Sequence, residues 1–276
     1  MSDKRTILIT GASTGIGLET ARTFKARGWQ VIASARKPED LARLTEQDGV
    51  VALPLELNDG TSVDRFFDAA LARAGGRIDA LYNNAAFGIV GAMEDVTPDV
   101  LRQQLEVNVV GTHALTRRVV PVMRKQGHGR IVFCSSVLGL VTGRYRGVYS
   151  ASKYALEAIA DAYRYELDGT GIRVAIIEPG PIRTAFLAST VATFRHAIDT
   201  QNSPHADAYR RRMAEMENET PSRFKLGPEA VARAVLHAVE SPRPKVRYRI
   251  SPHTHAIALA RRVLPGALLD RILMRA

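Results

Sequence analysis

A short apolar run followed at once by closely spaced glycines narrows the folds open to this chain. Residues 6–10 read TILIT, and residues 11–17 read GASTGIG before a helical stretch. Glycines in this G-x3-G-x-G spacing let the backbone turn tightly and approach a pyrophosphate, which then faces the N-terminus of the next helix. The pattern predicts a strand, a phosphate-binding turn and a helix.

The chain then repeats this alternation of apolar runs and helical stretches. The further runs that we expect to form strands are residues 29–35, 50–56, 79–84, 130–136 and 173–179. The stretches that we expect to form helices are residues 16–27, 38–47, 60–74, 98–126 and 149–169. Continuous apolar strands alternating with helices are typical of a parallel sheet covered on both faces. We therefore predict an α/β fold, a single doubly wound parallel sheet of the Rossmann type, in one domain over residues 1–276.

The character of the chain changes after the sixth predicted strand. Residues 184–222 are polar and carry few strand signals, and a long excursion after a strand commonly forms a lid or pocket wall. We expect a helical substrate lid there. The remaining predicted elements are a helix at 227–240, a strand near 245–250 and an amphipathic helix at 255–273, interrupted at Pro265-Gly266, within a C-terminal helical extension at 251–276.

Composition indicates a reducing compartment. The single cysteine, Cys134, excludes an internal disulfide, and it lies in an apolar run, where we expect a small core residue rather than a nucleophile. No stretch approaches the length of a membrane-spanning helix, and the N-terminus leaves no room for a signal peptide. We expect a cytoplasmic protein. The seven histidines show no ligand spacing, so no metal site is predicted.

Positive charge gathers towards the C-terminus. The formal net charge is +10, and residues 223–276 carry eleven Lys or Arg against three acidic residues. This excess is typical of a solvated, charge-rich tail, and it is also compatible with binding to an anionic membrane surface or an acidic partner. The last helix could pack over a cleft or a partner subunit, or lie in a membrane interface through its apolar face and basic rim. No recognised nucleic-acid module is present, so we expect no nucleic-acid partner.

Tyr149, Lys153 and Ser136 form the constellation that indicates chemistry. Tyr149 and Lys153 are four residues apart and share one helical face, so the ammonium can lie beside the phenol. A positive neighbour lowers a phenol pKa, and the phenol can then exchange a proton with a carbonyl oxygen. Ser136, thirteen residues before Tyr149, can hold that oxygen by a hydrogen bond. The trio predicts proton transfer at a carbonyl group.

The end of the second predicted strand indicates which dinucleotide binds. An acidic residue there would bind the ribose hydroxyl of NAD, whereas an arginine accommodates the 2′-phosphate of NADP. This chain reads Ser34-Ala35-Arg36-Lys37. Arg36 can form a fork onto a phosphate and Lys37 adds charge, so we predict NADP(H). The alternative is that both are solvated residues that begin a loop.

Several motifs in this order resemble the short-chain dehydrogenase/reductase family over nearly the whole chain. TGASTGIG matches its cofactor motif, and Asn83-Asn84-Ala85-Ala86 matches its NNAG motif with alanine in place of the last glycine. The resemblance implies a catalytic set of Asn108, Ser136, Tyr149 and Lys153. The cofactor-binding residues that the motifs and the resemblance together indicate are Gly11, Ser13, Thr14, Gly15, Ile16, Gly17, Arg36, Lys37, Glu56, Leu57, Asn84, Ala85, Tyr149, Lys153, Pro179, Gly180, Ile182 and Thr184.

Two departures from the family pattern affect cofactor packing. Glu56, followed by Leu57, stands where the family has an aspartate, and Ala86 replaces a glycine. Neither removes a catalytic group. The LELND segment, residues 184–222 and the ending KVRYRISP resemble the steroid and retinol dehydrogenase branch and bacterial NADP-dependent aldehyde reductases.

The resemblance implies a reaction in which NADPH reduces an apolar aldehyde or ketone and Tyr149 acts as the general acid. Lys153 would hold the nicotinamide ribose, and Asn108 would position a water that connects Lys153 to solvent. An oxidative alcohol, hydroxysteroid or retinol dehydrogenase is an alternative, and a non-catalytic NADP(H)-binding sensor is another. Candidate substrate-pocket residues, which could equally be core residues, are Phe87, Leu138, Tyr145, Phe186 and Phe194. The resemblance also implies a homodimer or homotetramer through the helices predicted at 98–126 and 149–169.

Overall fold

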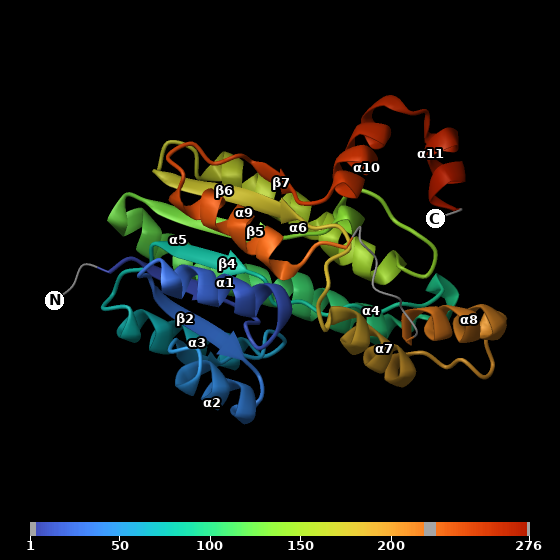
Figure 1. The fold of residues 1–276 in the computed structure, drawn as a ribbon, viewed down its shortest axis with the longest axis horizontal. Coiled ribbons are helices and arrows are strands. Elements are labelled where there is room, and N and C mark those ends of the chain that lie inside the picture. The colour runs from blue at the N-terminus through green and yellow to red at the C-terminus, as the bar shows by residue number, and fades with distance from the viewer. Residues whose placement is uncertain (1–3, 218–224, 275–276) are drawn as a thin grey trace.

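A seven-stranded parallel sheet runs through the computed structural model, which describes residues 4–217 and 225–274 (Figure 1). The strands are β1 (Thr6–Ile9), β2 (Gln30–Ala35), β3 (Val51–Pro54), β4 (Ala80–Asn83), β5 (Gly129–Cys134), β6 (Ile172–Glu178) and β7 (Arg247–Arg249). Their order across the sheet is β3-β2-β1-β4-β5-β6-β7, and every neighbouring pair is parallel. The predicted doubly wound α/β fold is confirmed.

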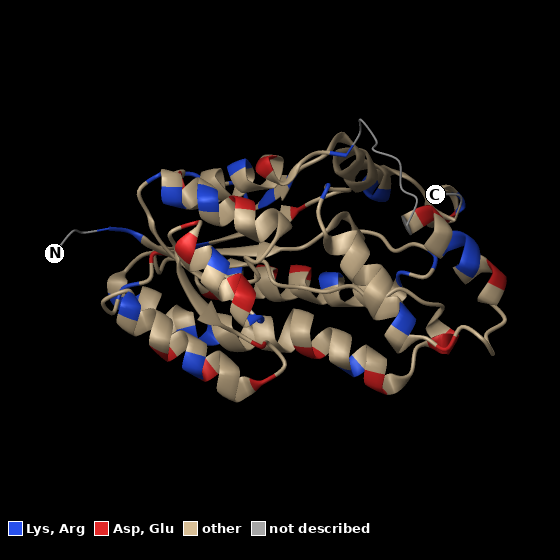
Figure 2. Ribbon diagram, turned by 60° about the horizontal axis from the view of Figure 1, so that its bottom comes forward, with Lys and Arg blue, Asp and Glu red and all other residues tan. Residues whose placement is uncertain are grey.

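Helices cover both faces of this sheet. On one face lie α1 (Gly15–Ala26), α2 (Pro38–Glu46) and α9 (Pro228–Glu240), and on the other lie α3 (Gly60–Arg73), α5 (Thr112–Gln126) and α6 (Gly147–Glu166). Side chains alternate between the faces along a strand. In β1, Ile7 and Ile9 pack towards α1 and α9, whereas Leu8 packs towards α3 and α5. Charged residues of both signs lie along the outer surfaces of the helices (Figure 2).

The helix expected over residues 98–126 is interrupted. It consists of α4 (Pro98–Leu105), a π-helical turn at Glu106–Gly111 and then α5. A side chain at Gly111 would collide with the backbone carbonyl of Leu57, so the glycine lets this turn approach the loop after β3. Apolar periodicity does not reveal such a turn, because a π-bulge only shifts the register by a residue. The turn carries Asn108 into the interior.

Two helical segments extend from the end of the sheet where the strands finish (Figure 1). The first is α7 (Phe186–Ala197) with α8 (Ala206–Glu217), which make up most of the described part of the predicted lid; residues 218–222 lie outside the described residues. The second is α10 (Pro252–Val263) with α11 (Gly266–Leu273), which project from the body. The predicted interruption at Pro265-Gly266 is confirmed. Among the described residues, no helix is long and apolar enough to cross a membrane.

The last strand is held to the body by ion pairs. Arg247 in β7 lies 3.1 Å from a carboxylate oxygen of Glu157 and 2.7 Å from one of Asp161, both in α6. It also lies 3.2 Å from Glu178 in β6, whose side chain is fully buried and also pairs with Arg249. The burial of Glu178 makes these arginines necessary, because an unpaired charge there would be costly.

Candidate active site

A cleft of about 1100 Å³ lies along the edge where the parallel strands end. Such an edge is where open α/β sheets bind ligands. The predicted site residues that line it are Gly11, Ser13, Thr14, Gly15, Ile16, Arg36, Glu56, Leu57, Asn84, Ala85, Phe87, Ser136, Leu138, Tyr145, Tyr149, Lys153, Pro179, Gly180, Ile182, Thr184 and Phe186. Gly17, Lys37, Asn108 and Phe194 do not line it.

Thr10, the residue after β1, joins the glycine turn to the end of β4. Its hydroxyl accepts hydrogen bonds from the backbone N–H groups of Asn84 and Ala85, both at 3.0 Å. The Asn84 side chain in turn donates to the carbonyl oxygens of Thr10 and Gly11 at 3.0 and 2.9 Å. A side chain at Gly11, where φ is +67°, would lie 2.8 Å from the Cα of Ala85. A side chain at Gly17 would collide with the Gly11 carbonyl, so Gly17 supports the turn from below the cleft.

The N-terminus of α1 fits a pyrophosphate group. Thr14 precedes the helix, and in the structure its side chain makes no capping hydrogen bond to the first turn. The N–H groups of that turn are therefore left for an anion, which the helix dipole also favours. Ser34 in β2 accepts a hydrogen bond from the Gly11 N–H at 3.1 Å and keeps the turn close to the next strand.

Arg36 and Lys37 take different positions after β2. Arg36 lines the cleft, and no acidic residue stands at this strand end. Lys37 is exposed, and its ammonium lies 3.7 Å from the carboxylate of Glu39. Arg36 is therefore placed for a phosphate on the adenine-side ribose, while the contribution expected from Lys37 stays a prediction.

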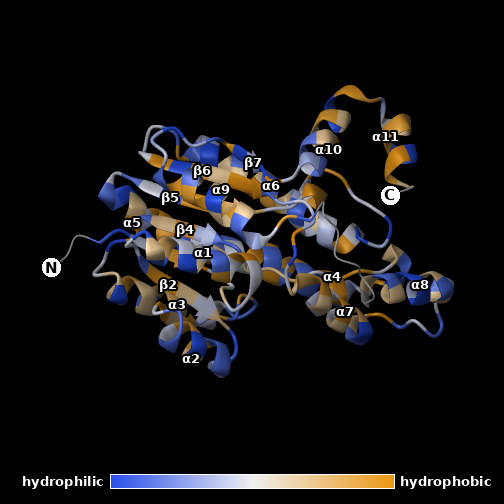
Figure 3. Ribbon diagram, viewed as in Figure 1, coloured by the Kyte–Doolittle hydropathy of each residue, from blue (hydrophilic) through white to orange (hydrophobic). Residues whose placement is uncertain are grey.

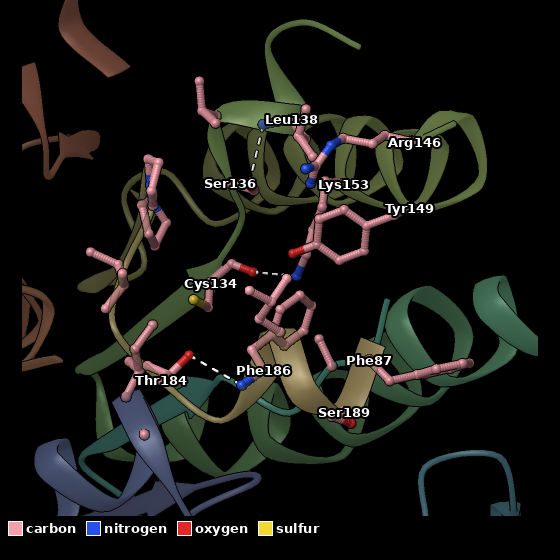
Figure 4. A pocket seen from close by; sticks show the side chains of 18 of the residues that line it. Phe87, Cys134, Ser136, Leu138, Arg146, Tyr149, Lys153, Thr184, Phe186 and Ser189 are labelled. Carbon is pink, nitrogen blue, oxygen red and sulfur yellow. Dashed lines mark hydrogen bonds between the residues drawn. The ribbon is translucent and has the colours of Figure 1, made fainter. Parts of the chain in front are cut away.

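Ser136, Tyr149 and Lys153 meet between the end of β5 and the start of α6 (Figure 4). The Lys153 side chain is almost fully buried, and its Nζ donates to the carbonyl oxygen of Cys134 at 2.8 Å. That Nζ also lies 5.5 Å from the centre of the Tyr149 ring. The hydroxyl of Ser136 accepts from the Leu138 N–H at 3.1 Å, and it lies close enough to the Tyr149 phenol to affect its pKa.

The protonation of this group differs from the expectation. Burial and the neighbouring Cys134 raise the pKa of the Tyr149 phenol, while the nearby Ser136 hydroxyl and the charge of Arg146 oppose the rise. Burial likewise lowers the pKa of Lys153. The expected lowering of the Tyr149 pKa by its positive neighbour is not observed, because burial outweighs the surrounding charges. The phenol thus holds its proton and is suited to donate it.

Asn108 lies behind the cleft and is completely buried. Its side chain accepts from the Phe87 N–H at 3.1 Å, and it donates to the Phe87 carbonyl at 3.0 Å and to the Ser152 hydroxyl at 3.1 Å. These bonds join the loop after β4 to α6. Asn108 is therefore a positioning residue for the wall that carries Phe87. The water that the family resemblance assigns to it stays a prediction.

Apolar side chains line the cleft beside Tyr149. They are Phe87, Leu138, Tyr145 and Phe186, and the ring centre of Phe186 lies 5.6 Å from that of Tyr149. Phe194 lies elsewhere: it is buried in a separate apolar cluster, with its ring centre 5.1 Å from that of Tyr209. Its expected place in the pocket is corrected, because α7 turns that residue away from the cleft.

Arg146 is the main cleft residue that the sequence-based reasoning missed. It precedes Tyr149 by three residues at the start of α6, and the two side chains lie next to each other (Figure 4). That spacing places both on one helical face and could have identified it. The roles of Thr10, the first residue of the TGASTGIG motif, and of Ser34, near the end of β2, were also missed, because the sequence does not show which distant backbone groups a single hydroxyl contacts.

Known proteins resemble this chain along almost its whole length. The oxidoreductase YbbO of Escherichia coli K12 is 41% identical over 271 residues, which are 98% of this chain and 94% of that protein. The NADPH-dependent 3-dehydrocapnine reductase of Ornithobacterium rhinotracheale is 31% identical over 97% of this chain and 95% of its own. A solved dehydrogenase structure from Streptomyces avermitilis superposes with a TM-score of 0.80 at 29% identity, covering 98% of this chain and 97% of that one. A family model described as "short chain dehydrogenase" matches residues 5–194.

Proposed function

This chain belongs to the short-chain dehydrogenase family, and we propose that it is an NADPH-dependent reductase of apolar aldehydes and ketones. It is an oxidoreductase that acts on CH–OH and C=O groups with a nicotinamide cofactor. The observation that carries the finer proposal is the meeting of Ser136, Tyr149 and Lys153 in one cleft with the glycine turn. Phe87 and Phe186 beside the phenol support an apolar carbonyl compound.

Each of the three side chains has a separate role in the proposed carbonyl reduction. When bound, the cofactor supplies the hydride. The Tyr149 phenol donates a proton to the carbonyl oxygen, and the Ser136 hydroxyl donates a hydrogen bond that stabilises negative charge as it develops there. Lys153 uses one of its three ammonium donors on Cys134, which leaves two for the phenol and the cofactor ribose.

Tyr149 carries the proton that reduction of a carbonyl group consumes. A phenol whose pKa is raised by burial is protonated at neutral pH, as a general acid must be. An oxidative dehydrogenase would use the same phenol as a base, because the reverse reaction passes through the same transition state, and the direction in the cell then follows the ratio of NADPH to NADP⁺. A non-catalytic NADP(H) sensor would have no need for Ser136, Tyr149 and Lys153 together in the cleft.

The cofactor preference rests on Arg36. A guanidinium at the end of β2 can form two hydrogen bonds to a phosphate. No acidic residue stands there to bind the ribose 2′-hydroxyl of NAD. A relative of similar length is named as NADPH-dependent, which supports the same choice. Comparable catalytic efficiency with NADH and NADPH would contradict it.

The deciding experiment follows NADPH oxidation across aliphatic aldehydes, retinal and steroid ketones, with wild type and Tyr149→Phe side by side. We expect turnover by the wild type and a loss of at least about 100-fold in the variant. NADPH binding, measured by fluorescence titration, should be the same in both. Equal turnover by the two proteins would refute the assignment of Tyr149. Tight NADPH binding without turnover of any carbonyl would favour the sensor.

The projecting α10–α11 hairpin is proposed as a contact with an anionic lipid surface. Leu259, Val263, Leu268 and Ile272 are between 43 and 65% exposed, and hydrophobic residues follow the turn and α11 (Figure 3). The basic excess over residues 223–276 complements anionic lipid. His253, Ile257 and Leu273 line the cleft from the same hairpin, so apolar substrates could enter from the lipid. The cytoplasm remains the proposed compartment, since the only cysteine is a free thiol.

Vesicle sedimentation tests this contact on the full chain. We expect wild type to sediment with phosphatidylserine vesicles and less with phosphatidylcholine vesicles. The double variant Val263→Ser and Ile272→Ser should lose most of this binding, while Met93→Ser, an exposed apolar residue elsewhere, should retain it. Equal sedimentation of the two variants would refute the lipid contact. Self-association of the hairpin would then be the remaining explanation for its exposed apolar residues, and light scattering would detect it.

A homodimer or homotetramer through α4–α5 and α6 is the proposed assembly. Val110 and Tyr165 on these helices are 47 and 67% exposed, which supports a covering partner. Sedimentation velocity should give a multiple of the 30.2 kDa chain mass. A monomer at micromolar concentration would contradict this, and Tyr165→Glu should shift a dimer towards monomer.

A further inference from the structure

Four arginines line one end of the cleft. Arg144 and Arg146 precede Tyr149, and Arg211 and Arg212 lie on α8; we call these four residues the arginine cluster. Glu215 also lines this end, and it pairs with Arg212 at 3.2 Å. Within the described residues, the other three arginines of the cluster form no ion pair with a carboxylate. The side of the cleft next to the proposed acid therefore carries excess positive charge.

Arg146 is the member of the cluster that is placed to meet a substrate. It is half-buried beside Tyr149, and it is close enough for its charge to affect the phenol pKa. Burial lowers the pKa of Arg146, and the like charge of Arg212 lowers it further. A guanidinium withdrawn from water and set against another cation is unfavourable unless an anion compensates it. Within a cleft, such a group points to a ligand.

The backbone next to Arg146 is strained. Tyr145 has φ +62°, and it is the only non-glycine residue among those described with a positive φ. A bulky residue reaches this region only when its surroundings enforce it, and such strain gathers at functional sites. The Tyr145 carbonyl accepts from the Gly91 N–H at 2.8 Å, and its ring packs 5.4 Å from Tyr209. Tyr145 and the two arginines that flank it all line the cleft.

We propose that Arg146, with Arg212 beside it, binds an oxyanion carried by the carbonyl substrate. This inference rests on the proposed reductase function and narrows its substrate class. The substrate would be an aldehyde or ketone with an apolar body against Phe87 and Phe186 and a carboxylate, sulfonate or phosphate at the arginine cluster. The planar fork of a guanidinium matches the oxygens of these groups.

The test compares two probes of nearly equal shape, para-carboxybenzaldehyde and its methyl ester. Arg146→Met removes the guanidinium and keeps an unbranched chain, and Arg146→Lys keeps the charge without the fork. We expect Arg146→Met to lower kcat/KM for the acid relative to the ester by roughly 10- to 100-fold, as for a lost charge-assisted hydrogen bond. The loss should appear in KM, because the interaction is the same in the ground and transition states. Arg146→Lys should fall between wild type and Arg146→Met.

Arg102→Met is the matched control. Arg102 is an exposed arginine of α4 that does not line the cleft, so its removal should leave the acid-to-ester ratio unchanged. Removal of Arg146 also raises the Tyr149 pKa, but this affects both probes equally and leaves the ratio untouched. An acid-to-ester ratio that is the same in Arg146→Met and wild type overturns the proposal, whatever the absolute rates.

A binding measurement separates this inference from the proposed reaction. Calorimetry with para-(hydroxymethyl)benzoate on NADP-saturated protein reports the oxyanion contact without turnover. If Arg146→Met weakens this binding and Arg102→Met does not, the oxyanion contact is supported. If in addition neither aldehyde is reduced, only the proposed reaction fails. Binding equal in wild type and Arg146→Met would overturn the contact. Sulfonate and phosphate analogues of the same ring then identify the preferred oxyanion.

Discussion

The ammonium nitrogen of Lys153 lies 2.8 Å from the backbone carbonyl oxygen of Cys134 and donates a hydrogen bond to it. This bond ties α6, which carries Tyr149, to the end of β5, which leads into Ser136. Both partners are buried, so the bond is not exchanged for water. The distance between the phenol and the serine hydroxyl therefore depends on Lys153 as well as on the sheet.

The pH dependence of reduction should reveal the state of Tyr149. A general acid loses activity as the pH rises through its pKa, and burial raises this pKa above the ordinary phenol value. We expect kcat for reduction to stay level from about pH 6 to about pH 9 and to fall only at higher pH. Steady-state assays at saturating NADPH and aldehyde measure this profile. A decline centred near neutral pH would instead mean that Lys153 lowers the Tyr149 pKa in the complex.

Removal of Arg36 should weaken the use of NADPH specifically. Arg36→Ala removes the guanidinium from the end of the cleft where the ribose phosphate is proposed to lie. We expect kcat/KM for NADPH to fall by roughly 10- to 100-fold and that for NADH to change little. Arg65→Ala is the control, since Arg65 is an exposed arginine of α3 that does not line the cleft. Equal losses with both cofactors would show that Arg36 acts on structure and not on the phosphate.

Truncation of Asn108 should destabilise the wall of the cleft. Asn108→Ala leaves the Phe87 N–H without its side-chain partner and removes one of the two amide donors to the Phe87 carbonyl, which keeps Gln104 at 2.8 Å. We expect the free energy of unfolding to fall by about 2–3 kcal/mol and the KM for carbonyl substrates to rise. Urea denaturation and kinetics measure the two effects. The control Asn58→Ala, at an exposed asparagine, should change neither the stability nor the KM. If Asn108→Ala is as stable as wild type, Asn108 does not position the cleft wall.

Arg247→Met should destabilise the protein in a pH-dependent manner. Arg247 neutralises Glu157 and Glu178, and burial raises the pKa of both carboxyls. Its removal should cost about 3 kcal/mol near neutral pH, because buried charge is left without its partner.

The sign of the pH effect follows from proton linkage. A carboxyl whose pKa is raised in the folded state binds its proton more tightly there, so folding gains stability as the pH falls through that pKa. The destabilisation by Arg247→Met should accordingly be smaller at about pH 5 than at about pH 7 in urea denaturation. Arg102→Met, at an exposed pair, should show little change at either pH. A loss that grows on acidification would contradict the pairing.

Local patterns predicted much of this molecule. The strands were expected within one or two residues of their ends, since each is a short apolar run with its own flanking signals. Tyr149 and Lys153 were recognisable because they lie four residues apart, about one turn of a helix, and therefore on the same helical face. The π-helical turn at Glu106–Gly111 escaped prediction, because α4, the turn and α5 share one helical periodicity. Phe194 was misplaced because a buried aromatic and a pocket aromatic look the same in a sequence.

The amino-acid sequence by itself determined the doubly wound sheet, the glycine turn and the spacing of Ser136, Tyr149 and Lys153. Each depends on residues that are neighbours in the chain or on apolar periodicity, which acts locally. Only the tertiary structure decided that burial raises the pKa of Tyr149, and that Arg146, just before α6, lies near enough to Arg212 of α8 for their charges to interact. Desolvation and long-range charge contacts depend on which distant segments pack together, and no local pattern encodes that.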